Sequence, residues 1–77
     1  MAISEQIKTD IYNTIGKNIK KYRQLIRITQ RELADRALVS ENLIAKLEST
    51  TRQTISIDTL EIIANVLDVE ISKLFEK

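Results

Sequence analysis

The sequence predicts a small all-α domain, and three observations support this prediction. Pro is absent and Gly occurs once in 77 residues, so few residues interrupt helices. Apolar residues recur at intervals of three or four, which is the spacing of one face of an α-helix. Ser or Thr precedes several of these apolar segments, where its side chain can cap a helix. We therefore expect five helices in one compact domain covering residues 1–77.

The first predicted helix is the longest and ends near Arg27. Residues 1–14 are an N-terminal extension of this helix, because Ile3 continues its apolar pattern towards the N-terminus. Its apolar face is expected to contain Ile7, Ile11, Ile15, Ile19, Tyr22 and Ile26.

Two short helices are predicted in the middle of the chain. Thr29 and Glu32 have the spacing of a capping box, in which each side chain binds the other residue's backbone N–H, so the second helix begins at Gln30. Ser40 can cap the third helix. Helices of about eight residues do not persist alone, so packing must hold them. The residues expected to be buried are Leu33, Ala34, Ala37, Ile44 and Leu47.

Two further helices are predicted after the polar segment STTRQT. Ser56 is expected to cap the fourth helix, and Asp68 to end it. Residues 70–77 are expected to form a short fifth helix. The face of the fourth helix that turns inward is expected to contain Ile57, Leu60, Ile63, Ala64 and Leu67.

The composition excludes several classes of function. The chain has no Cys and no His, which excludes thiolate nucleophiles, imidazole bases, disulfides and the usual zinc sites. It also has no Gly-rich phosphate loop, and its apolar runs are too short to span a membrane. We expect no enzymatic activity, metal, cofactor or small-molecule ligand, and a cytoplasmic location.

Positive charge is concentrated in one part of the chain. Residues 17–52 contain nine basic and four acidic residues, whereas residues 53–77 contain two basic and five acidic residues. A solvated helix face would explain the basic segment, but a surface that faces phosphate would explain it as well. The two short central helices favour the second explanation, because they are separated only by the residues LVS and so predict a helix-turn-helix.

Residues 15–75 resemble the Cro/lambda-repressor-type, or XRE-like, helix-turn-helix family. The matching motifs are TQRELA at the second helix, VS before the third, LE at its end, and SIDTLEIIANVLDVEISKLF at the end of the domain. The resemblance implies a lambda-repressor-like five-helix fold with a central helix-turn-helix. It also implies a transcriptional regulator that binds a specific sequence of double-stranded DNA.

The resemblance makes the third helix the one that reads bases. Asn42 can pair with adenine, Lys46 with guanine, and Leu43 can contact a thymine methyl group. Glu41 either accepts a hydrogen bond from cytosine or only stabilises the helix N-terminus, and the sequence leaves both possibilities open. The residues expected to bind phosphate are Lys17, Lys20, Thr29, Gln30, Arg31, Ser40, Thr51 and Arg52.

The resemblance also implies an ion pair between Arg23 and Glu48 that ties the third helix to the first. The family usually has glycine at four positions that here contain other residues, and each position tends to need a positive φ angle. Those four positions are Arg27, Leu38, Thr50 and Asp68.

A homodimer on an inverted repeat is expected, because one domain reads only about four to six base pairs. The candidate dimer residues are Ile62, Val66 and Phe75, and Ile3 with Ile7 offers a second surface. Phage or plasmid repressors and restriction-modification controllers are the expected functional types. The alternatives are an antitoxin that binds both DNA and a toxin, and a helical bundle that binds only protein.

Overall fold

The computed structural model describes the backbone of residues 2–49 and 53–77, and the side chains of residues 11–49 and 53–77. Its elements are α1 (Ala2–Leu25), α2 (Gln30–Ala37), α3 (Glu41–Glu48), α4 (Ile57–Val66) and the 3-10 helix η1 (Ile71–Phe75). The described residues form no strand, and the all-α prediction is confirmed. Within the described part of the chain, no helix is long and apolar enough to cross a membrane.

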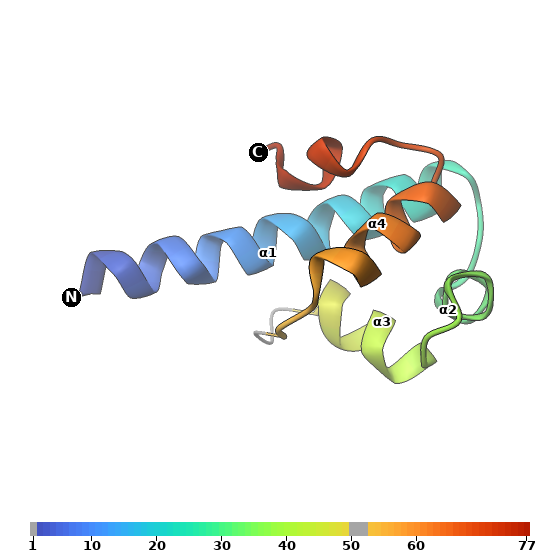
Figure 1. Ribbon diagram of the computed structural model, residues 1–77, viewed down its shortest axis with the longest axis horizontal. Coiled ribbons are helices and arrows are strands. Elements are labelled where there is room, and N and C mark those ends of the chain that lie inside the picture. Colours follow the sequence, from blue (N-terminus) through green and yellow to red (C-terminus); the bar gives the residue numbers. More distant parts are fainter. Residues whose placement is uncertain (1, 50–52) are drawn as a thin grey trace.

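The other elements pack around the C-terminal half of α1, while its N-terminal part projects beyond them (Figure 1). Helix α1 contacts α3 and η1, and α2 contacts both α3 and α4. The short helices α2 and α3 therefore lie between two longer supports. This arrangement fixes the helix-turn-helix without requiring either short helix to be stable alone.

The hydrophobic core draws residues from every element. Its fully buried large side chains are Ile19, Leu33, Ile44, Leu60, Ile63, Leu67 and Leu74. Three isoleucines that were expected to face inward are instead substantially exposed: Ile11 by 43 %, Ile26 by 40 % and Ile57 by 64 %. They lie where α1 leaves the body, just after α1 ends, and at the first position of α4. Helical spacing predicts which residues lie on one face of a helix. It does not predict how much of that face the neighbouring elements bury.

The predicted helix boundaries are confirmed where capping residues mark them. The hydroxyl of Thr29 accepts the backbone N–H of Glu32, and the Glu32 carboxylate accepts that of Thr29, at 3.0 and 2.9 Å. Ser40 and Ser56 cap α3 and α4 through hydroxyl oxygens that accept N–H groups three positions later. The fifth helix is a 3-10 helix rather than an α-helix, and 3-10 geometry is common in such short segments.

Among the described residues, three that are not glycine adopt the left-handed conformation, at positions that the family resemblance pointed to. Arg27, Leu38 and Asp68 have φ angles of 59°, 58° and 60°. They follow α1, α2 and α4, and the residue after each donates its N–H to the carbonyl five positions earlier, at 3.0–3.2 Å. This is the Schellman closure, which usually has glycine at the left-handed position. Thr50 lies outside the described residues, so that expectation stays a prediction.

Candidate nucleic-acid interface

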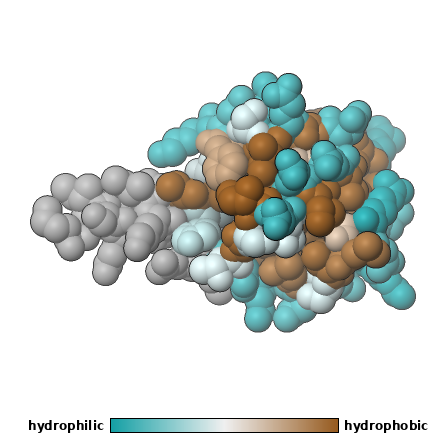
Figure 2. Space-filling model, viewed as in Figure 1, coloured by the Kyte–Doolittle hydropathy of each residue, from teal (hydrophilic) through white to brown (hydrophobic). Residues whose placement is uncertain are grey.

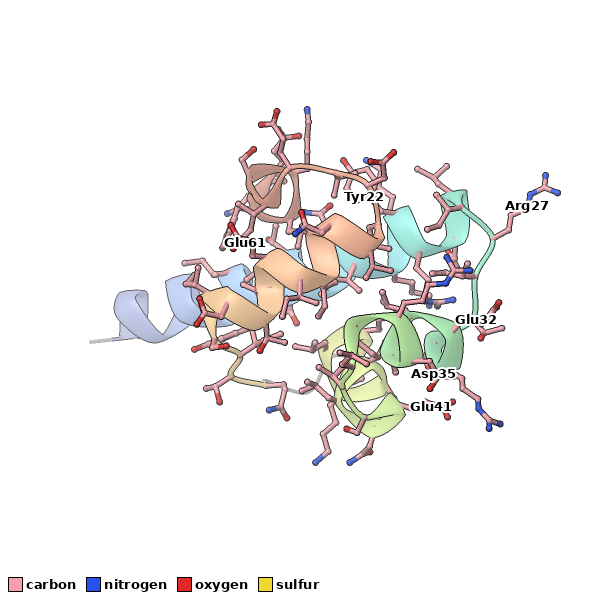
Figure 3. All side chains as sticks on the ribbon, turned by 45° about the vertical axis from the view of Figure 1, so that its right-hand side comes forward. Tyr22, Arg27, Glu32, Asp35, Glu41 and Glu61 are labelled. Atoms are coloured by element: carbon pink, nitrogen blue, oxygen red, sulfur yellow. The ribbon has the colours of Figure 1, made fainter. Side chains whose placement is uncertain are left out.

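Helix α3 buries one face and exposes the other. Ile44 and Leu47 are buried, whereas Glu41, Asn42 and Lys46 are exposed. Figure 3 shows Glu41 near the start of α3 with its side chain directed away from the core. These three exposed side chains give α3 a polar face that can donate and accept hydrogen bonds.

Leu43 does not belong to that exposed face as fully as the sequence suggested. Its side chain is half-buried and packs against the hydrophobic core. Its backbone N–H donates to the Ser40 hydroxyl that caps the helix. The amount of Leu43 surface left for a thymine methyl group is therefore smaller than expected.

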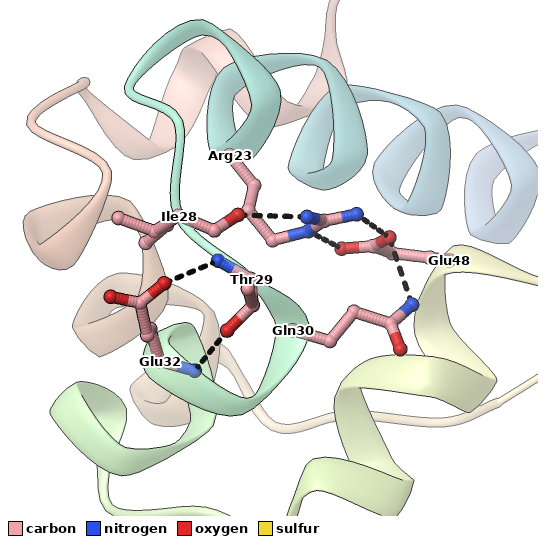
Figure 4. A network of polar contacts seen from close by, with 6 residues as sticks. All are labelled: Arg23, Ile28, Thr29, Gln30, Glu32 and Glu48. Atoms are coloured by element: carbon pink, nitrogen blue, oxygen red, sulfur yellow. Dashed lines mark hydrogen bonds and ion pairs between the residues drawn. The ribbon is translucent and has the colours of Figure 1, made fainter.

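An ion pair anchors the C-terminal end of α3 to α1 (Figure 4). The guanidinium of Arg23 donates from Nε to Glu48 Oε2 at 2.6 Å and from Nη2 to Glu48 Oε1 at 2.8 Å. Its third nitrogen, Nη1, donates to the carbonyl of Ile28 at 2.8 Å. The hydrogen bond with Glu48 raises the pKa of Arg23 above its ordinary value. The structure thus places the two residues in contact, as the family resemblance implied, with the two-pronged geometry typical of strong arginine–carboxylate pairs.

Gln30 joins this cluster instead of pointing freely into solvent. Its Nε2 donates to Glu48 Oε1 at 3.1 Å, which links the first residue of α2 to the last residue of α3. The side chain was expected to bind phosphate. In this structure its amide donates within the protein, where it helps to fix the angle between the two helices.

Gly16 allows α1 and α3 to approach closely, a role that the sequence alone did not predict. A Cβ atom at this position would lie 1.9 Å from the carbonyl oxygen of Leu47. The detectable signal was a lone glycine inside a long predicted helix, where glycine is unfavourable and no turn requires it. Together with the Arg23–Glu48 pair, this close approach fixes the distance between α3 and α1.

The basic residues expected to bind phosphate do not all lie together. Lys20 is one helical turn after Gly16 and so lies close to the face of α1 that contacts α3. Lys17 instead lines a hollow with Asn18, Glu76 and Lys77. Arg31 is exposed in the first turn of α2. Thr51 and Arg52 lie outside the described residues.

Two exposed hydroxyl groups lie at helix N-termini. Thr29 and Ser40 are exposed, and each uses its oxygen as an acceptor for a backbone N–H. A hydroxyl that accepts in this way can still donate its own hydrogen. Ser40 can therefore cap a helix and donate to a phosphate oxygen at the same time, whereas the Thr29 hydroxyl also interacts with the Glu32 carboxylate.

The candidate dimer residues fall on different parts of the surface. Ile62 is 46 % exposed, whereas Val66 is half-buried and packs against the core. Phe75 is 43 % exposed and lines an apolar groove with Ile11 and Ile57. Figure 2 shows apolar surface where α1 leaves the body. Nothing is described for the side chains of Ile3 and Ile7.

Comparisons with known proteins agree with this geometry. A family model described as helix-turn-helix matches residues 19–74. The immunity repressor protein of Bacillus phage phi105 is 34 % identical over 61 residues, which cover 79 % of this chain and 42 % of the repressor. The chain thus spans less than half the length of that relative.

Two solved structures share the fold at low sequence identity. The clp gene regulator ClgR from Corynebacterium glutamicum gives a TM-score of 0.78 at 23 % identity, over 83 % of this chain and 67 % of that one. The restriction-modification controller protein C.AhdI from Aeromonas hydrophila gives 0.77 at 20 % identity, over 83 % and 96 %. At these identities the likeness demonstrates the fold alone.

Proposed function

The chain belongs to the helix-turn-helix family of DNA-binding transcriptional regulators, and we propose that it binds an inverted-repeat operator in double-stranded DNA as a homodimer. The observation that supports this proposal best is the polar face of α3. Glu41, Asn42 and Lys46 are exposed on a helix that Arg23 and Glu48 hold in place. In helix-turn-helix proteins the corresponding helix enters the major groove.

We assign base reading to that face. Asn42 has an amide that fits N6 and N7 of adenine, and Lys46 has an ammonium that fits O6 and N7 of guanine. Glu41 accepts from a cytosine amino group or stabilises the start of α3, and its substitution separates the two roles. Leu43 contributes the part of its side chain that the core leaves exposed.

Phosphate binding is assigned to the exposed cations and hydroxyls around α3. Lys20 on α1 and Arg31 at the start of α2 supply positive charge, with Lys17 further away. Ser40 supplies a hydroxyl donor at the N-terminus of α3, and Thr29 places its hydroxyl, which it shares with Glu32, at the N-terminus of α2. Affinity through such contacts depends strongly on salt, because phosphate neutralisation releases counterions.

The homodimer is proposed because one domain reads too few base pairs to select a single site in a genome. Exposed apolar side chains are available for an interface at Phe75 and Ile62, and Val66 lies one helical turn after Ile62 on α4. Two-fold symmetry of the protein would be matched by an inverted repeat in the operator.

The biological setting that we propose is regulation of a promoter in the cytoplasm. The phage immunity repressor, at 34 % identity, supports a repressor-like role, and we extend the proposal to a controller-like role, since a restriction-modification controller has the same fold. The function is binding without catalysis, and bound protein would either block RNA polymerase or recruit it.

Selection of bound duplexes from a random pool tests the proposal. We expect enrichment of a palindrome whose half-site centres lie about one helical turn apart. Titration of the selected duplex should then show an affinity that falls steeply as salt rises. Asn42→Ala and Lys46→Ala should each alter the selected sequence. Lys73→Ala on η1 is the matched control and should leave it unchanged. Failure to enrich any duplex, or binding without salt dependence, would contradict the proposal.

A further inference from the structure

Leu38 combines two features that the fold itself does not require. It is 91 % exposed, the highest exposure among the large hydrophobic residues that the structure describes. It also has φ 58° and ψ 40°, a left-handed conformation that is unfavourable for a side chain with a Cβ atom. Glycine would satisfy the same helix closure without the strain or the exposed apolar surface.

The position of Leu38 places it beside the reading end of α3. It lies in the turn between α2 and α3, two residues before Ser40, the N-cap of α3. The N-terminal residues of the second helix in a helix-turn-helix are the ones that contact base edges. A side chain in this turn is therefore carried to the edge of the DNA groove together with Glu41.

The chemistry of the turn favours a base over a phosphate as the partner. A leucine side chain offers a phosphate neither charge nor a hydrogen-bond donor, whereas its neighbours Arg36 and Ser40 together offer both. The only apolar group that a base edge presents in the major groove is the 5-methyl group of thymine. Leu43, which the sequence predicts to contact a thymine methyl group, is half-buried against the core in this structure.

We propose that Leu38 is a specificity-determining residue that packs against the 5-methyl group of a thymine at one position of each half-site. The inference rests on the proposed function, since it requires an operator. It adds a base contact from the turn, outside the helix that provides the other contacts. The contact covers a leucine side chain that the free protein leaves in water.

Two variants test the protein side of this contact on the operator selected with the full chain. Leu38→Gly and Leu38→Asn both tolerate the left-handed conformation and both remove the apolar side chain. We expect each variant to bind the operator about tenfold more weakly, since partial burial of a leucine gives an effect of this order. We also expect the melting temperature of Leu38→Gly to equal or exceed that of the wild type.

The DNA side is tested by replacing each thymine of the operator with uracil, which removes only the methyl group. For the wild type, one thymine per half-site should weaken binding about fourfold when replaced. For Leu38→Asn, the same replacement should have no effect, so the two changes are coupled. A purely structural role for Leu38 would weaken binding equally to every one of these duplexes.

Asp68→Gly is the matched control, because Asp68 has the same backbone conformation after α4. It should retain operator affinity within about twofold, and its charge change could only strengthen DNA binding. The inference is overturned if Leu38→Asn binds as tightly as the wild type, or if its response to uracil is unchanged. Unchanged operator binding with lost transcriptional control would identify a protein partner for Leu38 instead. If the wild type enriches no duplex, the proposed function itself fails.

Discussion

The two ends of α3 are held in different ways. At the C-terminal end, Leu47 is buried with its carbonyl against Gly16, and Glu48 receives three hydrogen bonds from Arg23 and Gln30. At the N-terminal end, Glu41 and Asn42 are exposed, and the Ser40 hydroxyl provides the local cap. The helix is therefore positioned from the end that does not read bases. The reading end needs only to stay helical.

Gly16→Ala, which changes the anchored C-terminal end of α3, should have the largest effect on stability. Alanine normally stabilises a helix relative to glycine, but here its Cβ would meet the Leu47 carbonyl at 1.9 Å. We expect the free energy of unfolding to fall by about 3 kcal/mol, at the upper end for overpacking, since the opposing atom is backbone. Denaturant unfolding measures this loss. Lys17→Ala on the exposed face of α1 is the control and should change stability little. Increased stability of Gly16→Ala would contradict the close approach.

Breaking the ion pair should have the next largest effect. Arg23→Met leaves the Glu48 carboxylate, whose side chain is 2 % exposed, with Gln30 as its remaining side-chain partner. We expect a loss of about 2 kcal/mol, because an unpaired buried charge is unfavourable. Adding Glu48→Leu to Arg23→Met should recover part of this stability, since no isolated charge remains. A double-mutant cycle from denaturant unfolding measures the coupling, and additive losses would rule out the anchoring role.

Ser40→Ala tests the N-terminal end of α3, which the Ser40 hydroxyl caps. Removal of the cap should lower the free energy of unfolding by about 1 kcal/mol, and operator binding should weaken through fraying of the reading end and through loss of the hydroxyl proposed to bind phosphate. Ser56→Ala is a matched control, because Ser56 caps α4 through the same backbone hydrogen bond, and its hydroxyl donates in addition to Thr59 Oγ1 at 2.9 Å. It should reduce stability by a similar amount and leave operator affinity almost unchanged. Equal effects of the two variants on binding would show that the start of α3 has no special role.

Glu41→Ala should have a smaller effect on stability, about 0.3–1 kcal/mol, from the loss of a carboxylate in the first turn of α3. Asp58→Ala in the first turn of α4 provides the comparison. Repeating the duplex selection with both variants separates the two roles of Glu41. Relaxed preference at one base pair for Glu41→Ala alone identifies a base contact, whereas unchanged preference identifies a cap.

The smallest effect on stability is expected from protonation of Glu32, in the first turn of α2, at low pH. Hydrogen bonds from Thr29, first from its backbone N–H, lower the pKa of Glu32 from its ordinary value. A carboxylate with a lowered pKa stabilises the fold above its unfolded pKa, and this contribution is lost as pH falls through the folded pKa. Wild-type stability should therefore decrease below about pH 4.5 slightly more than that of Glu32→Gln. Urea unfolding of both proteins between pH 7 and pH 3 measures the difference, and parallel pH profiles would contradict it.

The sequence predicts best those features that depend on neighbouring residues. The Thr29–Glu32 capping box, the Ser40 and Ser56 caps and the buried pair Ile44 and Leu47 are all set within one helical turn, and the structure contains them. The left-handed positions could be located because the family resemblance supplied the usual glycines.

Features that depend on how helices cross could not be predicted in the same way. The partner of Gly16 is 31 positions later in the sequence, at Leu47, and no local pattern links the two. The Gln30 amide is directed to Glu48 by the angle between α2 and α3. Leu43 is half-buried for a similar reason, since the core reaches further around α3 than its spacing indicates. For the candidate site, the exposed polar face of α3 was therefore predictable. Which of the site residues hold the helices in place and which remain exposed to DNA was not.

The separation of the anchored end from the exposed face has a consequence for how such a regulator changes its target during evolution. Glu41, Asn42 and Lys46 are exposed and do not belong to the buried core, so we expect their replacement to leave the packing of α1 against α3 intact. New base preferences can then arise by single substitutions without first acquiring compensating changes elsewhere. A library randomised at these three codons, with Gly16, Arg23 and Glu48 kept, would retain a folded scaffold in most of its members and could be searched for new operators.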